Sequence, residues 1–300
     1  MPIPVGKKRS SAHAGGDFNS DATRPPVVLI TGASSGFGKA CAQHLGIKGY
    51  RVYGTSRRAI WNPAPKRDSP GNGTFQLIPM DVCDTASVDA GVDTILKTSG
   101  RIDVVVCNAG FGLAGSVEDS TVEEAKRQFE TNFFGTWRVC RAALPHLRRQ
   151  KASYLVIVGS LAGLMGIPFQ AAYSASKFAL EGLAEALRME VKPWGVHVVL
   201  IQPGDFHTGF TRNRIKTTAS GQNPAYAASF SRALAVMEKD ERQGPPPEKI
   251  AHLVERIITH PAPRLRYTAG TMSQRVGALL KRVLPGRLFE WLMMATYKLN

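Results

Sequence analysis

The stretch Val27-Val28-Leu29-Ile30-Thr31-Gly32-Ala33-Ser34-Ser35-Gly36-Phe37-Gly38 sets the fold of this chain. The apolar, β-branched run at its start predicts a buried strand, and the amphipathic segment after it predicts a helix to about Lys48. Glycines between the two allow the backbone to approach a pyrophosphate, and the free N–H groups of the helix N-terminus face that anion. A glycine-rich turn in this position therefore predicts a dinucleotide site in an α/β fold.

The rest of the chain alternates apolar runs with helical patterns, as a parallel sheet covered by helices requires. No internal repeat and no linker interrupts it, so we expect one domain over residues 25–270. The helix over 121–150 should break near Pro145, because proline removes a helical hydrogen bond. We expect strands at 49–58, 74–82, 104–106, 154–158, 196–202 and 265–268, a surface loop at 60–73, and helices at 87–98, 121–150, 168–191, 227–239 and 247–259.

Composition narrows the class of protein. The 300 residues carry a formal net charge of +15, a balance that suits nucleic acid or anionic lipid. No recognised nucleic-acid module accompanies the charge, so nucleic-acid binding is not expected. The four cysteines (Cys41, Cys83, Cys107, Cys140) are widely spaced, which disfavours a metal site and predicts free thiols in a reducing compartment.

The chain shows no secretory signal and no apolar run of the roughly 20 residues that a membrane span needs. Residues 1–24 are rich in small and polar side chains, and we expect a disordered leader there. The expected location is cytoplasmic, with contact to a membrane surface left open for the C-terminal tail.

The segment Tyr173-Ser174-Ala175-Ser176-Lys177 places a phenol and an ammonium four residues apart, on one face of a helix. An ammonium there favours the phenolate, so we expect Lys177 to lower the pKa of Tyr173 and to tune it for proton transfer. Ser160 follows the apolar run 154–158, at the carboxyl end of a strand, where open α/β sheets bind ligands. Alone, the Tyr173–Lys177 pair is more typical of an ordinary surface pair on an amphipathic helix, because such pairs are common.

Two further features carry both a functional and a structural interpretation. Strand two ends in Ser56-Arg57-Arg58, without the acid that takes the ribose hydroxyls of NAD in dinucleotide folds. Guanidinium groups there suit a 2′-phosphate, which favours NADP(H) over NAD(H), although a solvated basic turn has the same sequence. Asn132 lies in the middle of a helical pattern, which predicts a hydrogen-bonding task that is either functional or structural.

Six separated motifs occur in the order and spacing of one known family: Thr31-Gly32-x-x-x-Gly36-x-Gly38, Asn108-Ala109-Gly110, Asn132, Ser160, Tyr173-x-x-x-Lys177 and Pro203-Gly204. With these motifs the chain resembles the short-chain dehydrogenases/reductases over about Val27 to Thr208. The resemblance implies an α/β, Rossmann-type doubly wound sheet of seven parallel strands with helices on both faces. It also implies a bound NAD(H) or NADP(H).

The resemblance assigns roles to individual residues. Tyr173 would be the general acid/base, Lys177 would lower its pKa and hold the nicotinamide ribose, and Ser160 would bond the substrate oxygen. Asn132 would hold a water in a proton relay to Lys177. Asp81 and Val82 would flank the adenine, and Thr208 would hold the carboxamide. The cofactor-binding residues that the resemblance and the basic turn imply are Gly32, Ser34, Ser35, Gly36, Phe37, Gly38, Ser56, Arg57, Arg58, Asp81, Val82, Asn108, Ala109, Gly110, Tyr173, Lys177, Pro203, Gly204 and Thr208.

The segments expected to line the substrate pocket, residues 111–113, 161–169 and 206–210, are apolar with few charges. Residues 54–58 and 173–182 are similar to hydroxysteroid and retinol dehydrogenase-like members. The expected reaction is thus NADP(H)-dependent interconversion of an alcohol and a ketone or aldehyde on a steroid-, retinoid- or lipid-like small molecule. The alternative is a regulatory or scaffold protein that binds NADP(H) without turnover. We expect the protein to be a homo-oligomer.

Residues 271–300 form a separate amphipathic extension. Pro285-Gly286 should divide it into two helices. In the second, Leu288, Trp291, Leu292 and Ala295 recur at helical spacing, and Phe289 and Met293 widen that face. So large an apolar face predicts a partner, for which three candidates remain open: the substrate pocket, a second subunit of a homo-oligomer, or a membrane surface.

Overall fold

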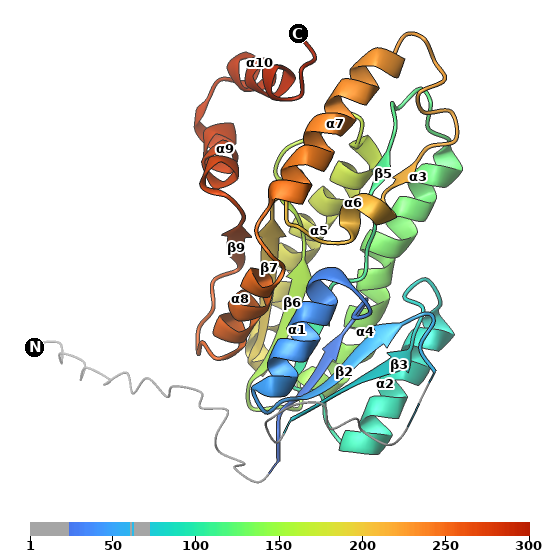
Figure 1. Ribbon diagram of the computed structural model, residues 1–300. Helices are drawn as coiled ribbons and strands as arrows, with labels where there is room; N and C mark the ends of the chain where they lie inside the picture. The colour runs from blue at the N-terminus through green and yellow to red at the C-terminus, as the bar shows by residue number, and fades with distance from the viewer. Residues whose placement is uncertain (1–23, 61, 63–72) are drawn as a thin grey trace, which may run out of the picture.

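The computed structural model describes residues 24–60, 62 and 73–300 of the chain (Figure 1). The predicted leader, apart from Arg24, and most of the predicted loop over 60–73 lie outside these ranges. Within them, seven strands form one parallel sheet in the order β3-β2-β1-β4-β6-β7-β9, which confirms the predicted sheet. The strands are β1 (Val27–Ile30), β2 (Arg51–Ser56), β3 (Thr74–Pro79), β4 (Val104–Cys107), β6 (Ser153–Val158), β7 (Val196–Pro203) and β9 (Arg266–Ala269).

Helices cover both faces of this sheet because alternate side chains of each strand point to opposite sides. Val28 and Ile30 of β1 pack with α1 (Gly36–Ile47) and α8 (Glu248–Ile258). Leu29 packs on the other face with α2 (Thr85–Ser99), α4 (Gly135–Leu147) and α5 (Ala171–Val191). The two apolar layers explain why the strand sequences are apolar throughout.

The carboxyl ends of all seven strands lie at the same edge of the sheet, because every pairing is parallel. The order of the strands reverses between β1 and β4. In open α/β sheets, ligands bind at the carboxyl edge beside such a reversal. The fold thus places the glycine-rich turn after β1 next to the segment after β4.

The helical region 121–150 is broken, but not where the sequence predicted. A π-helical turn, η2 (Glu130–Phe134), separates α3 (Val122–Phe129) from α4. Pro145 instead lies inside the last turn of α4, where the helix tolerates one missing hydrogen bond. The break therefore falls at Asn132, the residue for which a hydrogen-bonding task was predicted.

The remaining elements lie beyond the carboxyl edge or at the ends of the sheet. A small parallel pair, β5 (Leu113–Ala114) and β8 (Ile215–Lys216), accompanies α6 (Phe210–Asn213) and α7 (Ala227–Gln243). Short helices η3 (Leu161–Gly163) and η4 (Lys192–Trp194) flank α5.

The C-terminal tail consists of α9 (Met272–Val283) and α10 (Gly286–Thr296), so the predicted division at Pro285-Gly286 is confirmed. Figure 1 shows both helices in red, beside α7. No helix among the described residues is long and apolar enough to cross a bilayer. The four cysteines are free thiols, as predicted; Cys83 is half-buried and the others are buried.

Candidate active site

A cavity of about 1490 Å³ lies at the carboxyl edge of the sheet. Its wall includes residues that follow β1, β2, β4, β6 and β7, represented by Gly32, Arg57, Asn108, Gly159 and Gly204. Segments far apart in the sequence thus meet at one place. The position agrees with the strand-order argument given above.

The turn after β1 is fixed by the segment after β4. The Thr31 hydroxyl accepts hydrogen bonds from the backbone N–H groups of Asn108 (2.9 Å) and Ala109 (3.0 Å). The Asn108 side-chain amide donates to the carbonyls of Thr31 (2.9 Å) and Gly32 (3.2 Å). These bonds explain why a threonine precedes the glycines and why an asparagine follows β4.

The turn has the features that a pyrophosphate requires. Gly36 has a φ of +53°, which favours glycine, and a Cβ on Gly38 would lie 2.4 Å from the Gly32 carbonyl oxygen. Helix α1 begins at Gly36 with no side-chain cap at Ser35 and no acid in its first turn. Its unpaired N–H groups therefore favour an anion on the cavity side, so this chain's residues fit a dinucleotide.

The end of β2 presents the two predicted arginines to the same cavity. Arg57 and Arg58 are exposed, line the cavity, and follow Ser56, whose hydroxyl accepts from the Arg58 N–H at 3.3 Å. Asp81 and Val82, after β3, line the neighbouring part of the wall. The arrangement leaves the two guanidinium groups accessible to an anionic ligand.

Ser160, Tyr173 and Lys177 meet at the centre of the cavity. Ser160 follows β6, and its hydroxyl lies 3.4 Å from the Pro203 carbonyl oxygen. Tyr173 and Lys177, on the first turns of α5, are 9% and 7% exposed, and the lysine Nζ lies 5.8 Å from the centre of the tyrosine ring. The sheet and one helix thus bring together the three residues that the sequence placed on separate elements.

The pKa of Tyr173 is raised in this structure, where the sequence predicted a lowered one. Burial raises the pKa of Tyr173 to about 12, and a hydrogen bond with Ser160 only partly offsets this. Burial also lowers the pKa of Lys177 to about 8, and its Nζ donates to the Val158 carbonyl at 2.9 Å. Helical spacing gives the proximity correctly, but burial is the largest cause of both shifts, and it disfavours the charged form of each group.

Asn132 has a structural task that its position alone did not reveal. Its side-chain amide donates to the Phe111 carbonyl (3.1 Å) and to the Ser176 hydroxyl (3.2 Å), and its Oδ1 accepts from the Phe111 N–H (3.1 Å). The residue is 1% exposed. Asn132 therefore ties the segment after β4 to α5, directly beside Tyr173 and Lys177.

Nearly all the predicted site residues line the cavity. The exceptions are Gly38, which packs behind the turn, and Asn132, which lies behind the wall. The predicted site residues that line it are Gly32, Ser34, Ser35, Gly36, Phe37, Ser56, Arg57, Arg58, Asp81, Val82, Asn108, Ala109, Gly110, Ser160, Tyr173, Lys177, Pro203, Gly204 and Thr208.

The C-terminal tail contributes an apolar part of the wall of the cavity that Ser160 and Tyr173 also line. Phe289 of α10 is 5% exposed and packs with Leu161 and Met165, which follow β6. Leu292 and Met293 line the same cavity, as do Val276 and Leu280 of α9.

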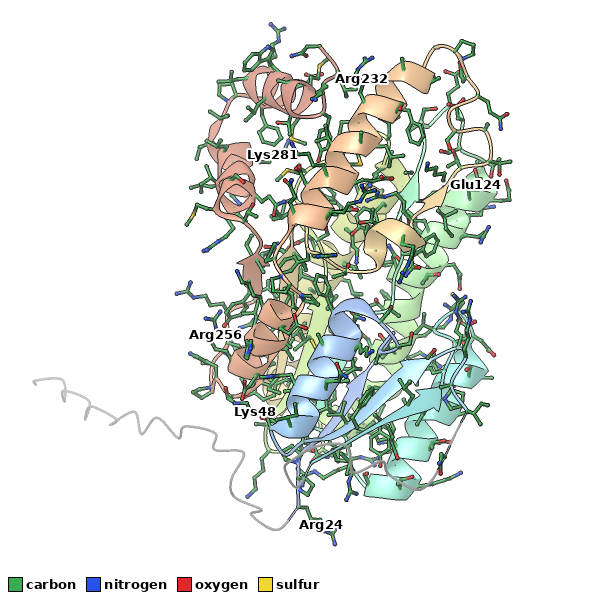
Figure 2. All side chains as sticks on the ribbon, in the orientation of Figure 1. Arg24, Lys48, Glu124, Arg232, Arg256 and Lys281 are labelled. Carbon is green, nitrogen blue, oxygen red and sulfur yellow. The ribbon has the colours of Figure 1, made fainter. Side chains whose placement is uncertain are left out.

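The tail is held at both ends, because Gln274 Nε2 donates to Asp205 (2.6 Å) and Arg232 Nε donates to the Lys298 carbonyl (2.9 Å). Figure 2 labels Arg232 on α7, facing the end of the chain.

The inward face of α10 is shifted from the predicted one. Leu288 and Trp291, predicted as part of the covering face, are 47% and 59% exposed. Ala295 is exposed as well, whereas Phe289, Leu292 and Met293 face the cavity. A helix that is apolar almost all round does not specify which side turns inward.

A group of charged residues at the cavity was not predicted from the sequence. Arg214 is 2% exposed in its side chain and pairs with the buried Glu241 of α7, which also accepts from Thr211 Oγ1 at 2.5 Å. Asp205, Asp240 and Glu241 all line the cavity. The spacing of Phe230, Leu234 and Met237 extends four residues further to Glu241, so helical periodicity places this carboxyl on the buried face of α7. Its pairing with Arg214 has no comparable signal in the sequence.

Asp205 should make folding stability depend on pH. Burial, followed by the charges of Glu241 and Asp240, raises its pKa from 3.8 to about 7. A carboxyl group whose pKa is higher in the folded than in the unfolded protein contributes stability that is fully present below its unfolded-state pKa. That stability is lost as the pH rises through its folded-state pKa. Asp205→Asn should therefore be more stable than the wild type at pH 8, by up to about 4 kcal/mol, and equal to it near pH 4.

Thermal unfolding across this pH range measures the difference. Asp93→Asn, on the exposed side of α2, makes the same charge change without the burial and should follow the wild-type curve. A constant gap between Asp205→Asn and the wild type at all pH values would contradict the assignment.

Comparisons with known proteins agree with this geometry. The short chain dehydrogenase family profile matches residues 26–219. A 3-ketodihydrosphingosine reductase from Bacteroides thetaiotaomicron is 42% identical over 92% of this chain and 100% of its own length. Human 17-beta-hydroxysteroid dehydrogenase type 1 is 35% identical (80% of this chain, 76% of its own), and bovine retinol dehydrogenase 8 is 31% identical (90% and 92%).

A solved structure shows the same fold. A short-chain dehydrogenase from Streptomyces avermitilis superimposes with a TM-score of 0.73 and 32% identity, covering 90% of this chain and 97% of its own. The family profile covers more than half of the chain, and the relatives exceed 30% identity over most of it. The chain therefore belongs to the short-chain dehydrogenase/reductase family of NAD(P)-dependent oxidoreductases.

Proposed function

We propose that this protein uses NADP(H) to interconvert a ketone and an alcohol on a long-chain, lipid-like substrate. The observation that carries the proposal is the apolar wall that the tail builds beside Ser160 and Tyr173. A cavity of this kind takes an apolar ligand and fixes its orientation by a few polar groups. The names of the three curated relatives denote enzymes of sphingoid, steroid and retinoid ketones or alcohols, which supports a lipophilic substrate.

The proposed chemistry divides between the cofactor and the chain. The nicotinamide, when bound, supplies or accepts the hydride. The raised pKa of Tyr173 keeps its hydroxyl protonated at neutral pH, ready to donate to the carbonyl oxygen of a ketone. Ser160 would hydrogen-bond the same oxygen, and Lys177 would hold the ribose and carry positive charge beside the phenol. Asn132 would keep α5 and the segment after β4 in register around this site.

The lining of the cavity is mixed in polarity, which favours an amphiphilic molecule. The tail contributes Phe289, Leu292 and Met293, and the carboxyl groups of Asp205 and Glu241 line the same cavity. Carboxyl groups accept hydrogen bonds, so a hydroxyl or amino group close to the substrate carbonyl suits them. A long aliphatic chain fits the apolar part. A long-chain ketone with a polar head therefore suits the cavity better than a wholly apolar one.

Oxidation of NADPH against straight-chain ketones of increasing length tests the proposal. We expect kcat/KM to rise about fourfold for each methylene that the tail covers, because burying one contributes about 0.8 kcal/mol. A chain truncated after Thr271 should lose this dependence and keep the activity on the shortest ketone. A flat profile in the wild type would contradict a lipid-like substrate, and the absence of turnover on every ketone would favour the regulator or scaffold.

A pair of point variants repeats this test without removing the tail. Phe289→Ala removes the buried contact with Leu161 and Met165 and should lower kcat/KM for long ketones selectively. Trp291→Ala, on the exposed side of the same helix, is the matched control. It should leave the dependence of kcat/KM on the length of soluble ketones unchanged. Equal losses in both variants would show that the effect is general destabilisation.

A further inference from the structure

We propose that the outer face of the tail is a docking surface for an anionic lipid bilayer. The tail uses one side of each helix to line the cavity, yet the opposite sides are also apolar. We define the tail stripe as the large apolar side chains of the two helices that are at least 37% exposed. Six of them lie outside the cavity lining and one, Val276, is also part of it: Met272, Val276, Leu279, Val283, Leu288, Trp291 and Met294.

The stripe on α9 follows helical periodicity. Met272, Val276, Leu279 and Val283 are spaced by four, three and four residues, which aligns them along one face. Their exposures are 70%, 44%, 58% and 65%, whereas Ala278 on the inner side is 7% exposed. The helix is therefore apolar on two sides, and the described chain covers only one of them.

On α10 the exposed side carries an aromatic anchor. Trp291 is 59% exposed and Met294 is 37% exposed, while the inner residue Phe289 is 5% exposed. Tryptophan is favoured at membrane interfaces, where its ring meets both apolar chains and polar headgroups. Figure 1 shows α9 and α10 together along one outer side of the molecule, so the two halves of the stripe belong to one region.

The cationic side chains of the tail indicate which partner binds this surface. Beyond Thr271 the chain carries five cationic side chains and a single acidic one, Glu290. All six are exposed. Lys281, labelled on α9 in Figure 2, has its Nζ 4.9 Å from the centre of the inner Phe289 ring, so we assign the charge of this surface to the other four cations. An apolar stripe flanked by lysine and arginine is the pattern of a helix that lies in the plane of an anionic membrane. The cationic residues are Arg275, Lys281, Arg282, Arg287 and Lys298.

A second copy of the chain fits this surface less well. A two-fold interface brings a patch against itself, so the cations of one tail would lie near those of the other, with only Glu290 of each tail to offset them. Charged residues are depleted from the centres of protein interfaces. A bilayer rich in anionic headgroups instead complements the charge and takes the apolar side chains.

The docking surface is continuous with the cavity. Val276 is 44% exposed in the stripe and also lines the cavity, as does its neighbour Gly277. A bound bilayer would thus lie against the wall of the cavity. If the substrate is a lipid, this gives it a route from the membrane, a consequence that rests on the proposed function. The binding itself does not depend on the reaction.

Flotation with vesicles, in the absence of cofactor and substrate, tests the docking surface. The full chain should bind phosphatidylcholine vesicles that contain phosphatidylserine, bind pure phosphatidylcholine vesicles less, and be released by salt. Leu279→Glu combined with Trp291→Glu should weaken binding by about tenfold or more, because two buried apolar contacts are lost. Trp194→Glu is the matched control, since this tryptophan is 50% exposed on η4 and lies outside the tail; it should bind like the wild type.

Two results would overturn the proposal. Either no flotation occurs with anionic vesicles, or the double variant floats like the wild type. A sizing column separates the competing explanation: if the double variant converts a dimer into a monomer and the wild type does not float, the stripe is a subunit interface. Turnover of a short soluble ketone by the double variant shows that the variant is folded, and it reports on the proposed function separately.

Discussion

Tyr173→Phe should lower turnover by roughly 10²- to 10⁴-fold and leave the affinity for NADP(H) nearly unchanged. The substitution removes only the hydroxyl that hydrogen-bonds with Ser160. The ring keeps its place, because it packs 5.7 Å from the Phe210 ring and beside the Lys177 ammonium. With its raised pKa, the hydroxyl stays protonated at neutral pH beside Ser160, and phenylalanine cannot replace it as a proton donor.

The experiment needs a control for the loss of a buried hydroxyl as such. Tyr53→Phe provides it, because the Tyr53 hydroxyl is buried and lies 2.6 Å from the Ser99 hydroxyl, outside the cavity. That variant should lose about 1 kcal/mol of stability and keep its turnover. Single-turnover kinetics on one ketone, with a fluorescence titration of NADPH, measure both quantities. Wild-type turnover in Tyr173→Phe would remove Tyr173 from the proposed mechanism.

The sheet and the glycine-rich turn could be predicted because their signals are local. A buried strand such as β1 must be apolar on both faces, and a helix N-terminus that faces an anion needs glycine where a Cβ would collide, as at Gly38. The position of Ser160 at the ligand-binding edge followed from the rule that parallel strands end at one edge, and its grouping with Tyr173 and Lys177 was implied by the family resemblance. These inferences need no knowledge of distant contacts.

The errors all concern properties set by tertiary packing. The pKa of Tyr173 depends on how much water reaches the phenol, and the spacing from Lys177 does not report this. The helix break at Asn132 reflects bonds to Phe111 and Ser176, which are distant in sequence. The charged pair of Arg214 and Glu241 is likewise non-local, and so is the choice of Phe289 over Trp291 as the inward residue of α10.

Replacement of Arg57 by Ala should raise the dissociation constant for NADPH by roughly ten- to a hundredfold and leave that for NADH unchanged. A charge-assisted bond to phosphate contributes about 1.5–3 kcal/mol, and only NADPH carries the 2′-phosphate. Arg58→Ala, tested alongside, decides which guanidinium makes the contact, because both line the cavity after β2. Arg148→Ala, exposed at the end of α4, removes the same charge elsewhere and should change neither constant.

The reciprocal change separates recognition of the phosphate from general attraction to a basic surface. A carboxylate at the end of strand two takes the ribose hydroxyls of NAD and repels a 2′-phosphate. Ser56→Asp combined with Arg57→Ala should therefore reverse the preference, tightening NADH while weakening NADPH. If the arginines acted only through the net charge of +15, added salt would remove the preference for the more highly charged NADPH and the double variant would bind both cofactors less tightly. Equal affinities for the two cofactors in the wild type would refute the preference, because the uncapped α1 turn binds the pyrophosphate that both share.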